Sequence, residues 1–148
     1  ATPYGRHRRE LELFLQERFD TTTLRLPALF GPGLKKNVVY DFLHQNQLEA
    51  ICPDGVFQFY SVERLWKDIG KAREHAIKLL NVSTEPMSVR RLARDAFGLE
   101  FDNPAATRAA RYDMRSKYDT LFGGAGGYLY RADEVLSDLR GYVESQRS

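Results

Sequence analysis

The sequence predicts an α/β protein that is mostly helical, with short strands and one β-hairpin. Apolar residues recur at helical spacing in several stretches, and short β-branched or apolar runs separate these stretches. Ser, Thr or Asn stands where several of the helices would begin, and an Asp-Gly pair lies between two of the apolar runs. The chain of 148 residues is long enough to bury a core.

The first expected element is a helix that runs to about residue 19. Thr2 can act as its N-cap, and Pro3 occupies the first helical position. Tyr4, Arg8 and Leu11 are separated by four and three residues, so they lie on one stripe of the helix. This stripe is expected to face a neighbouring element rather than open water.

A strand and a short helix are expected next. Residues 21–30 are rich in β-branched and apolar side chains and end at Gly-Pro-Gly, which is typical of a strand with Pro27 near its carboxyl end. Asn37 then caps a short helix that ends near residue 45 or 46.

The centre of the chain is expected to hold a hairpin and the longest helix. Asp54-Gly55 connects the apolar runs 50–52 and 56–60, which predicts a β-hairpin. Ser61 is placed as the cap of a helix whose apolar positions recur at steps of three and four residues as far as Leu80.

The last third of the chain predicts a brief strand at 81–82 and two further helices. Ser88 caps a helix that stops at Gly98, because Ser favours the first position and Gly the left-handed conformation after the last turn. A short helix near 116–122 follows, and apolar residues at helical spacing near Leu136 and Leu139 predict a terminal helix.

Composition excludes several classes of protein. Hydrophobic residues make up 43% and charged residues 28% of the chain, and no run of about 18 apolar residues is present. A net charge of +2 is too small to indicate a nucleic-acid or membrane partner. The single cysteine fits a reducing cytoplasm, and we expect a cytoplasmic protein. The three histidines and Cys52 lack metal-ligand spacing, so no metal site is expected.

Tyr4 and Arg8 are the candidate catalytic residues. Four residues apart on a helix, a phenol and a positive charge lie on the same face. Such a charge can stabilise a phenolate that takes part in proton transfer.

In its order of motifs the chain resembles the extended short-chain dehydrogenase/reductases, the NAD-dependent epimerase/dehydratase family. In that family a Tyr-x-x-x-Lys helix precedes a strand that reads Leu-Arg-x-x-x-x-(Tyr/Phe)-Gly-Pro-Gly. Here Tyr4 and Arg8 take the places of the Tyr and the Lys, Leu24-Arg25 begins the strand motif, and residues 30–33 read Phe-Gly-Pro-Gly. The later elements follow the order of the family's substrate-binding part, so the resemblance covers nearly the whole chain.

The resemblance implies a division of the chain at residue 34. Residues 1–34 would be the catalytic Tyr helix and the following strand of a Rossmann-like core, and residues 35–148 would be the substrate-binding lobe. The chain would then be the C-terminal portion of a larger enzyme whose N-terminal Rossmann half it lacks. The implied site is catalytic Tyr4 and Arg8, cofactor-binding Pro27 and Leu29, and substrate-binding Asn37, Gln58 and Tyr60.

The implied cofactor is NAD or NADP, bound by the full-length parent. The chain alone is not expected to bind it, because it has no Gly-rich turn between a strand and a helix. The Gly-rich residues 123–127 are followed by Leu129 where the third glycine of that motif is needed, and they are expected to form a flexible turn.

Two departures from the family pattern bear on function. Arg8 keeps the charge of the family's Lys but has a larger, planar head. Phe57 stands where nucleotide-sugar members carry an Arg that contacts a diphosphate, which argues against a nucleotide-sugar substrate. The expected reaction is that of an epimerase, dehydratase or reductase on the hydroxyl or carbonyl of a sugar-like small molecule.

Two other classes of function stay open. One is a sensor or structural protein of the same fold whose catalytic machinery has decayed. The other is a free-standing interaction module that binds nucleic acid weakly through its arginines. We also expect a homo-oligomer, because the apolar stripe of Leu11, Phe14 and Leu15 would otherwise be exposed.

Overall fold

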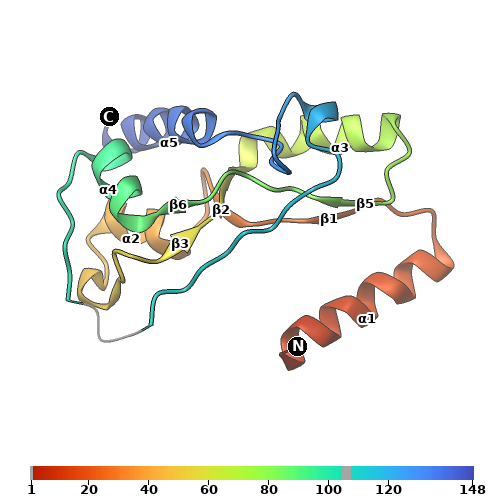
Figure 1. Cartoon of the computed structure of the whole chain (residues 1–148), viewed down its shortest axis with the longest axis horizontal. Helices are drawn as coiled ribbons and strands as arrows, with labels where there is room; N and C mark the ends of the chain where they lie inside the picture. The colour runs from red at the N-terminus through yellow and green to blue at the C-terminus, as the bar shows by residue number, and fades with distance from the viewer. Residues whose placement is uncertain (1, 105–107) are drawn as a thin grey trace.

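The computed structural model describes residues 2–104 and 108–148, and it has the α/β character that the sequence predicts. Figure 1 shows helices α3 and α5 above the strands, and helix α1 below them. The helices are α1 (Pro3–Arg18), α2 (Asn37–His44), α3 (Leu65–Glu74), α4 (Val89–Phe97) and α5 (Ala132–Arg147). Short 3-10 turns are η1 (Leu48–Ala50), η2 (Val62–Arg64) and η3 (Thr120–Phe122). The strands are β1 (Thr23–Arg25), β2 (Ala28–Phe30), β3 (Val56–Phe57), β4 (Phe59–Ser61), β5 (Leu79–Asn81) and β6 (Met87–Ser88).

Within the described residues the strands form three separate pairs. Strand β1 runs parallel to β5, with Thr23 opposite Leu79, and β2 runs parallel to β4, with Ala28 opposite Phe59. Strand β3 is antiparallel to β6. Parallel pairs need long crossover connections, and here α2 and α3 lie within those connections.

The single strand predicted over residues 21–30 is divided in two. Strand β1 ends at Arg25, β2 begins at Ala28, and each pairs with a different partner. Pro27 therefore lies in the break and not near the carboxyl end of a strand. The reason is that proline has no N–H to donate to a ladder, so the chain changes partner there.

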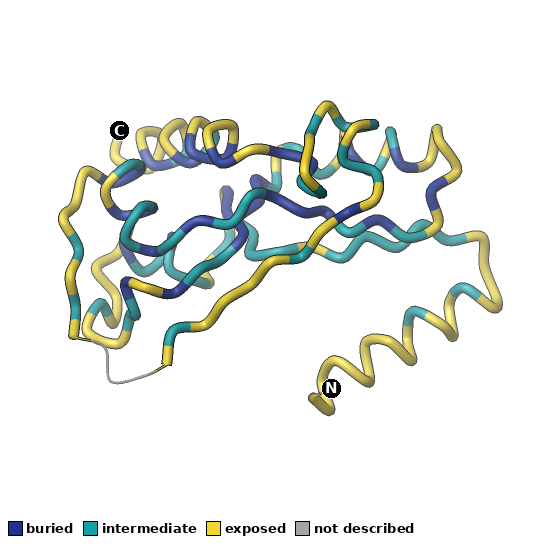
Figure 2. Tube along the Cα trace, in the orientation of Figure 1, coloured by how far each residue is buried: buried dark blue, intermediate teal, exposed yellow. Residues whose placement is uncertain are grey.

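Helix α1 matches the prediction in its extent and its cap. It ends at Arg18, and the Thr2 hydroxyl accepts a hydrogen bond from the Gly5 amide at 3.2 Å. None of its residues is buried, as Figure 2 shows along the length of the helix. The prediction that its stripe faces a neighbouring element is wrong for the described chain. Tyr4 is 68%, Leu11 58% and Phe14 50% exposed, because no other described element packs over this side of the helix.

The predicted β-hairpin is wrong. Residues 56–57 pair with β6, which lies about thirty residues further along the chain, and not with residues 50–52. The turn itself exists, since the Gly55 amide donates to the Cys52 carbonyl at 3.2 Å. The run before the turn is held elsewhere, because the Asn103 side-chain amide donates to the Ile51 carbonyl at 3.0 Å.

The predicted long helix ends early. Helix α3 stops at Glu74, and Leu80 is a fully buried member of strand β5. Ala76 has a φ of +52°, which reverses the chain, and the Thr23 amide then donates to the Lys78 carbonyl at 2.8 Å. Pairing with β1 therefore overrides the helical spacing. Ser61 belongs to β4, and its side chain makes no capping hydrogen bond.

The helices at the end of the chain agree better with expectation. The Ser88 hydroxyl accepts from the Arg91 amide at 3.1 Å, and α4 ends at Gly98 with a φ of +67°. Helix α5 carries Leu136 and Leu139 into the core. Between α4 and α5, the helix expected near 116–122 is only the 3-10 turn η3. Earlier in the chain, α2 ends at His44, one residue before the predicted end.

The core lies between the paired strands and helices α4 and α5 (Figure 2). It does not include α1. Among the described residues, no helix has both the length and the apolar character that a membrane crossing would require. The largest fully buried side chains include Tyr60, Phe30, Phe59, Leu80, Leu92 and Leu139.

Candidate functional site

Tyr4 and Arg8 contact each other on the exposed side of α1. The Arg8 guanidinium donates a hydrogen bond to the Tyr4 hydroxyl at 2.5 Å, and Tyr4 is 68% exposed. A guanidinium has donors only, so Arg8 does not take up the phenol proton. That proton is available to a third group. The two residues line a hollow of about 400 Å³, which we call the tyrosine hollow. Its wall consists of Tyr4, Gly5, Arg8, Arg9, Glu12, Arg25 and Leu26.

An ion pair attaches α1 to β1 beside this hollow. Glu12 accepts from the Arg25 Nε at 3.1 Å and from its Nη2 at 2.7 Å, which is a bidentate contact. The hydrogen bond from Arg25 lowers the pKa of the Glu12 carboxyl to about 2. Because the phenol and this carboxylate share one helix, the ion pair determines where Tyr4 lies relative to β1.

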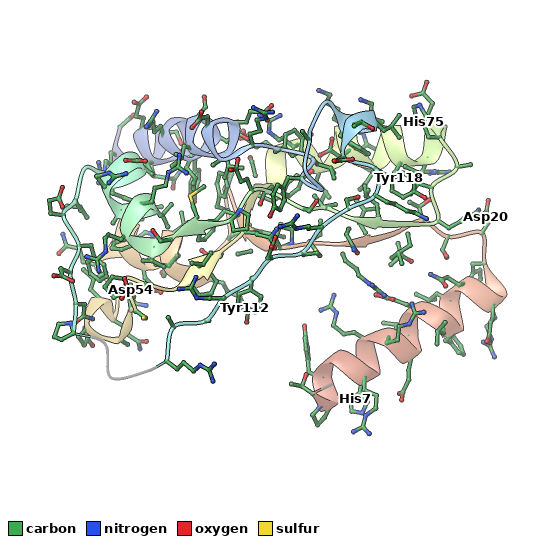
Figure 3. All side chains as sticks on the ribbon, in the orientation of Figure 1. His7, Asp20, Asp54, His75, Tyr112 and Tyr118 are labelled. Carbon is green, nitrogen blue, oxygen red and sulfur yellow. The ribbon has the colours of Figure 1, made fainter. Side chains whose placement is uncertain are left out.

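A second hollow, the apolar pocket, contains three of the site residues predicted from the sequence. Pro27, Asn37 and Gln58 line it together. Leu26 is a wall residue of both hollows, and it also lines the hollow between β1 and α3, so all three hollows border this residue. Tyr112, another wall residue of the apolar pocket, is labelled in Figure 3. The pocket has a volume of about 370 Å³ and is lined by Leu26, Pro27, Ala28, Asn37, Phe57, Gln58, Tyr112 and Met114.

The amide of Asn37 holds the wall of the pocket together. Its Nδ2 donates to the Leu29 carbonyl at 2.7 Å, and its Oδ1 accepts from the Val39 amide at 3.0 Å. Asn37 has a φ of +67° and begins α2, so these bonds join β2 to that helix. The cap position itself is Lys36, whose side chain makes no capping bond, so the helix begins one residue earlier than predicted. The Asn37 bond to the amide two residues ahead is an Asx-type contact in the first turn.

The side-chain amide of Gln58 also bonds to backbone groups, which belong to two segments far along the chain. Its Nε2 donates to the carbonyls of Thr84 and Met114 at 2.7 Å, and its Oε1 accepts from the Met114 amide at 2.7 Å. Gln58 is 3% exposed. It therefore fixes the segment around Met114 across the pocket, and it shapes the pocket without offering a free polar group.

The two remaining predicted residues, Leu29 and Tyr60, line neither hollow. Leu29 is a half-buried member of β2 that packs against the core, where its carbonyl accepts the bond from Asn37. Tyr60 is fully buried, and its hydroxyl donates to Asp68 at 2.5 Å. The structure thus brings Tyr4 and Arg8 together in one hollow, and Pro27, Asn37 and Gln58 together in another that shares Leu26 with it. It places Leu29 and Tyr60 elsewhere.

Asp68 is the centre of a buried polar cluster that the sequence analysis missed. It accepts from Tyr60 and also from the Tyr130 hydroxyl, at 2.8 and 2.9 Å. Burial, followed by the hydrogen bond to Asp68, raises the pKa of both phenols far above the ordinary value. The helical spacing places Asp68 on α3 but gives no sign of the two phenols, which come from β4 and from the segment before α5.

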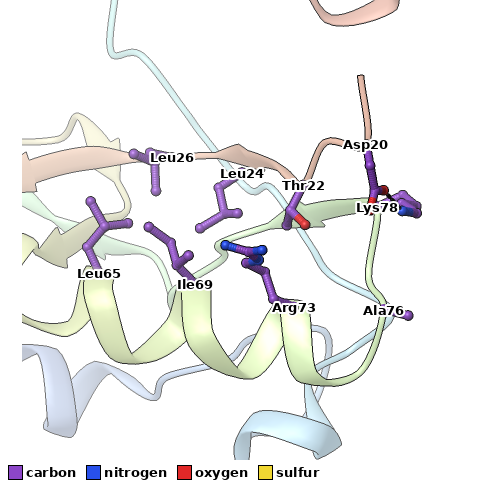
Figure 4. A pocket seen from close by; sticks show the side chains of 9 residues that line it. All are labelled: Asp20, Thr22, Leu24, Leu26, Leu65, Ile69, Arg73, Ala76 and Lys78. Atoms are coloured by element: carbon purple, nitrogen blue, oxygen red, sulfur yellow. Dashed lines mark hydrogen bonds and ion pairs between the residues drawn. The ribbon is translucent and has the colours of Figure 1, made fainter. Parts of the chain in front are cut away.

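Another hollow lies between β1 and α3 and contains no predicted site residue. Figure 4 shows Leu24 and Leu26 on the strand side and Leu65 and Ile69 on the helix side. Its volume is about 570 Å³, and its charged rim includes Lys78, which pairs with Asp20. Tyr4 is not among the residues that line this hollow.

The glycine-rich turn does not fit the phosphates of NAD or NADP. The Gly123 amide donates to the Thr120 carbonyl at 3.1 Å, and the Gly127 amide donates to the Asp119 carboxylate at 2.8 Å. These amide groups bond within the turn, so they cannot cradle a phosphate.

Within residues 2–104 and 108–148, no three His, Cys, Asp or Glu side chains gather in a way that could hold a metal ion. Comparisons of the chain with protein-family models, curated proteins and solved structures found no match.

Proposed function

We propose that this chain carries the catalytic tyrosine and the substrate-binding lobe of an NAD(P)-dependent epimerase, dehydratase or reductase with a Rossmann-like core. One observation carries the proposal. The apolar pocket that holds Pro27, Asn37 and Gln58 shares Leu26 with the hollow that holds Tyr4 and Arg8. A proton donor therefore lies beside a pocket of about 370 Å³, which is within the size range of small-molecule sites.

In this proposal Tyr4 transfers the proton. Its hydroxyl accepts from Arg8 at 2.5 Å, so the phenol O–H can point to the oxygen of a substrate carbonyl, and the phenolate can take a proton from a substrate hydroxyl. Arg8 supports the oxygen through its charge. The Glu12–Arg25 pair keeps α1 against β1 during the transfer.

NAD or NADP, when bound, supplies the acceptor or donor of the hydride. Its phosphates would bind to a part of the enzyme other than this chain, because the glycine-rich turn uses its own amides. Pro27 and Ala28 offer an apolar surface for the face of the nicotinamide ring. The same proposal includes a homo-oligomer in which a second chain covers Leu11, Phe14 and Leu15. A protein that stays monomeric at high concentration in analytical ultracentrifugation would contradict it.

A second candidate is a sensor of the same fold that binds the cofactor without turnover. Arg8 favours it, because the family's Lys is replaced by a guanidinium that contacts the phenol directly. The two candidates differ in one result. The sensor binds NAD(P) in the full-length protein and converts no hydroxyl or carbonyl compound.

The test is an assay of the full-length protein with NAD(P) and a panel of hydroxyl and carbonyl compounds. Nicotinamide absorbance reports net oxidation or reduction, and NMR of the products reports epimerisation or dehydration. We expect turnover that Tyr4→Phe removes and that Tyr40→Phe, outside both hollows, retains. Cofactor binding with no turnover of any compound would favour the sensor.

The same proposal predicts that this chain alone shows no saturable heat when titrated with millimolar NAD or NADP. A micromolar affinity would contradict the assignment of the phosphate site to another part of the enzyme.

A further inference from the structure

The apolar pocket has no charged side chain in its wall. Its two amide side chains, Asn37 and Gln58, already bond to backbone groups through both their nitrogen and their oxygen atoms. Gln58 uses both of its amide hydrogens in these bonds, and Asn37 uses one of its two. An anionic ligand would therefore lose its hydration in the pocket without gaining a cation from these walls. Removing an unpaired charge from water is unfavourable by several kcal/mol. The pocket consequently selects against phosphates and carboxylates.

One wall of the pocket is an aromatic platform. The rings of Phe57 and Tyr112 stack with their centroids 5.5 Å apart and an angle of 27° between their planes. Tyr112 is 58% exposed, so part of its ring remains open to a ligand, and Met114 lines the same pocket. Flat rings and thioethers both make favourable contacts with aromatic faces.

Hydrogen bonds hold this platform in place. The Val56 amide donates to the Ala110 carbonyl at 2.8 Å, and the Tyr112 amide donates to the Val56 carbonyl at 3.0 Å. Gln58 bonds to both the amide and the carbonyl of Met114. The segment that carries Tyr112 and Met114 is thus fastened to β3 and to the strand after it. Figure 3 shows Tyr112 on this segment beside β3. A wall fixed in advance binds a rigid ring at a low entropic cost.

We propose that the apolar pocket binds an uncharged aromatic ring of the substrate, stacked against Tyr112 and Phe57. The hydroxyl or carbonyl attached to that ring then points past Leu26 to Tyr4, and in this respect the inference rests on the proposed function. The substrate class is accordingly a neutral aryl alcohol or aryl carbonyl compound, and not a sugar nucleotide. Phe57, which stands where nucleotide-sugar members carry a diphosphate-binding Arg, contributes the inner ring of the platform.

The experiment measures binding by saturation-transfer NMR in the full-length protein without cofactor. The neutral probes are cinnamyl alcohol and naphthalenemethanol, and their matched anions are cinnamate and naphthoate. A uridine-diphosphate sugar serves as the third class of probe. We expect saturable binding of at least one neutral probe, at least about tenfold tighter than that of its carboxylate, because the pocket offers the charge no cation.

Three variants locate the binding. Tyr112→Ala removes the exposed ring and should weaken the neutral probe about tenfold, since stacking and buried area are both lost. Tyr112→Phe keeps the ring and should retain the affinity. Trp66→Ala removes an aromatic side chain that is 83% exposed and lies outside the pocket, so it should change nothing.

The inference is overturned if neither neutral probe binds, if the anions or the sugar nucleotide bind as tightly as the neutral probes, or if Tyr112→Ala leaves the affinity unchanged. The outcome is separate from that of the proposed function. Ring binding that depends on Tyr112, without turnover by NAD(P), would sustain the pocket assignment and reject the enzyme. Turnover of a sugar nucleotide that is lost in Tyr4→Phe would sustain the enzyme and reject the pocket assignment.

Discussion

Tyr4 and Tyr60 each lie 2.5 Å from a charged group, but their surroundings are opposite. Tyr4 is 68% exposed and accepts its hydrogen bond from a cation, Arg8. Tyr60 is fully buried and donates its proton to a carboxylate, Asp68. The comparison teaches that the sign of the partner and the burial of the ring decide what a tyrosine can do.

The buried phenol belongs to a cluster that connects three parts of the fold. Asp68 of α3 accepts from Tyr60 of β4 and from Tyr130, which precedes α5. Arg64 lies 4.5 Å from the centre of the Tyr130 ring and pairs with Asp138 of α5 at 3.0 Å. Because burial raises the pKa of both phenols, they keep their protons and serve the structure. The Tyr4 proton has no such acceptor among the described residues.

The comparison of the two tyrosines predicts its largest effect for a substitution at Tyr4, which should change kcat. Tyr4→Phe should lower kcat by about 10²–10⁴-fold, the range for loss of a positioned acid or base. The fold should be retained, because this ring is mostly exposed. Steady-state kinetics of the full-length protein, in the reaction proposed above, and urea unfolding measure the two effects. Turnover within about threefold of the parent would assign Tyr4 a structural role.

The second effect is on stability at Asp68. Asp68→Ala should reduce the free energy of unfolding by about 2–5 kcal/mol, because two buried phenols lose their acceptor. Tyr60→Phe should cost less, about 1–2 kcal/mol, since Tyr130 still donates to the carboxylate. Urea unfolding checks both. As a matched control, Asp54→Ala removes an exposed carboxylate and should leave the stability unchanged. A similar result for Asp68→Ala would show that the cluster does not stabilise the core.

A smaller effect is expected from acid on the attachment of α1. Arg25 holds the pKa of Glu12 at about 2, below its ordinary value of 4.5. The ion pair therefore contributes fully above about pH 4.5, and its contribution is lost as the pH falls towards about 2. Amide exchange across α1, measured over this window, should quicken with acid. Glu12→Gln should weaken the attachment and remove this contribution. Exchange in α1 that changes in the same way in both proteins would contradict the role of the pair.

The smallest effect is expected at Arg8. Arg8→Lys keeps the positive charge beside Tyr4 and restores the residue of the family pattern, so activity should be preserved or raised. Arg8→Met, which removes the charge, is the matched control and should lower kcat. Steady-state kinetics of the two variants would detect the difference. Equal activity in Lys and Met variants would show that the charge does not assist the phenol.

The sequence alone determined the elements whose hydrogen bonds are local. Helix α1 begins after Thr2, and α4 extends from Ser88 to Gly98, because caps and helical spacing act over three or four residues. The contact between Tyr4 and Arg8 follows from the same geometry, since residues four apart are neighbours on a helix.

Only the tertiary structure decided the elements whose partners are distant. The partners of β1 and β2 on either side of Pro27, the end of α3 at Glu74 and the absence of the hairpin all depend on strands that pair across tens of residues. Local spacing carries no information about those partners, and the same apolar residue, such as Leu80, can complete a helix face or a strand.

The candidate site divides along the same line. The sequence places Tyr4, Asn37 and Gln58 in the site through a resemblance, but it gives no geometry for them. Folding decided that the amides of Asn37 and Gln58 would bond to backbone, and that Tyr112 would stack on Phe57 from more than fifty residues away. The physical reason is that a pocket is made by side chains from several elements, and their meeting is determined by the packing of the core and not by spacing along the chain.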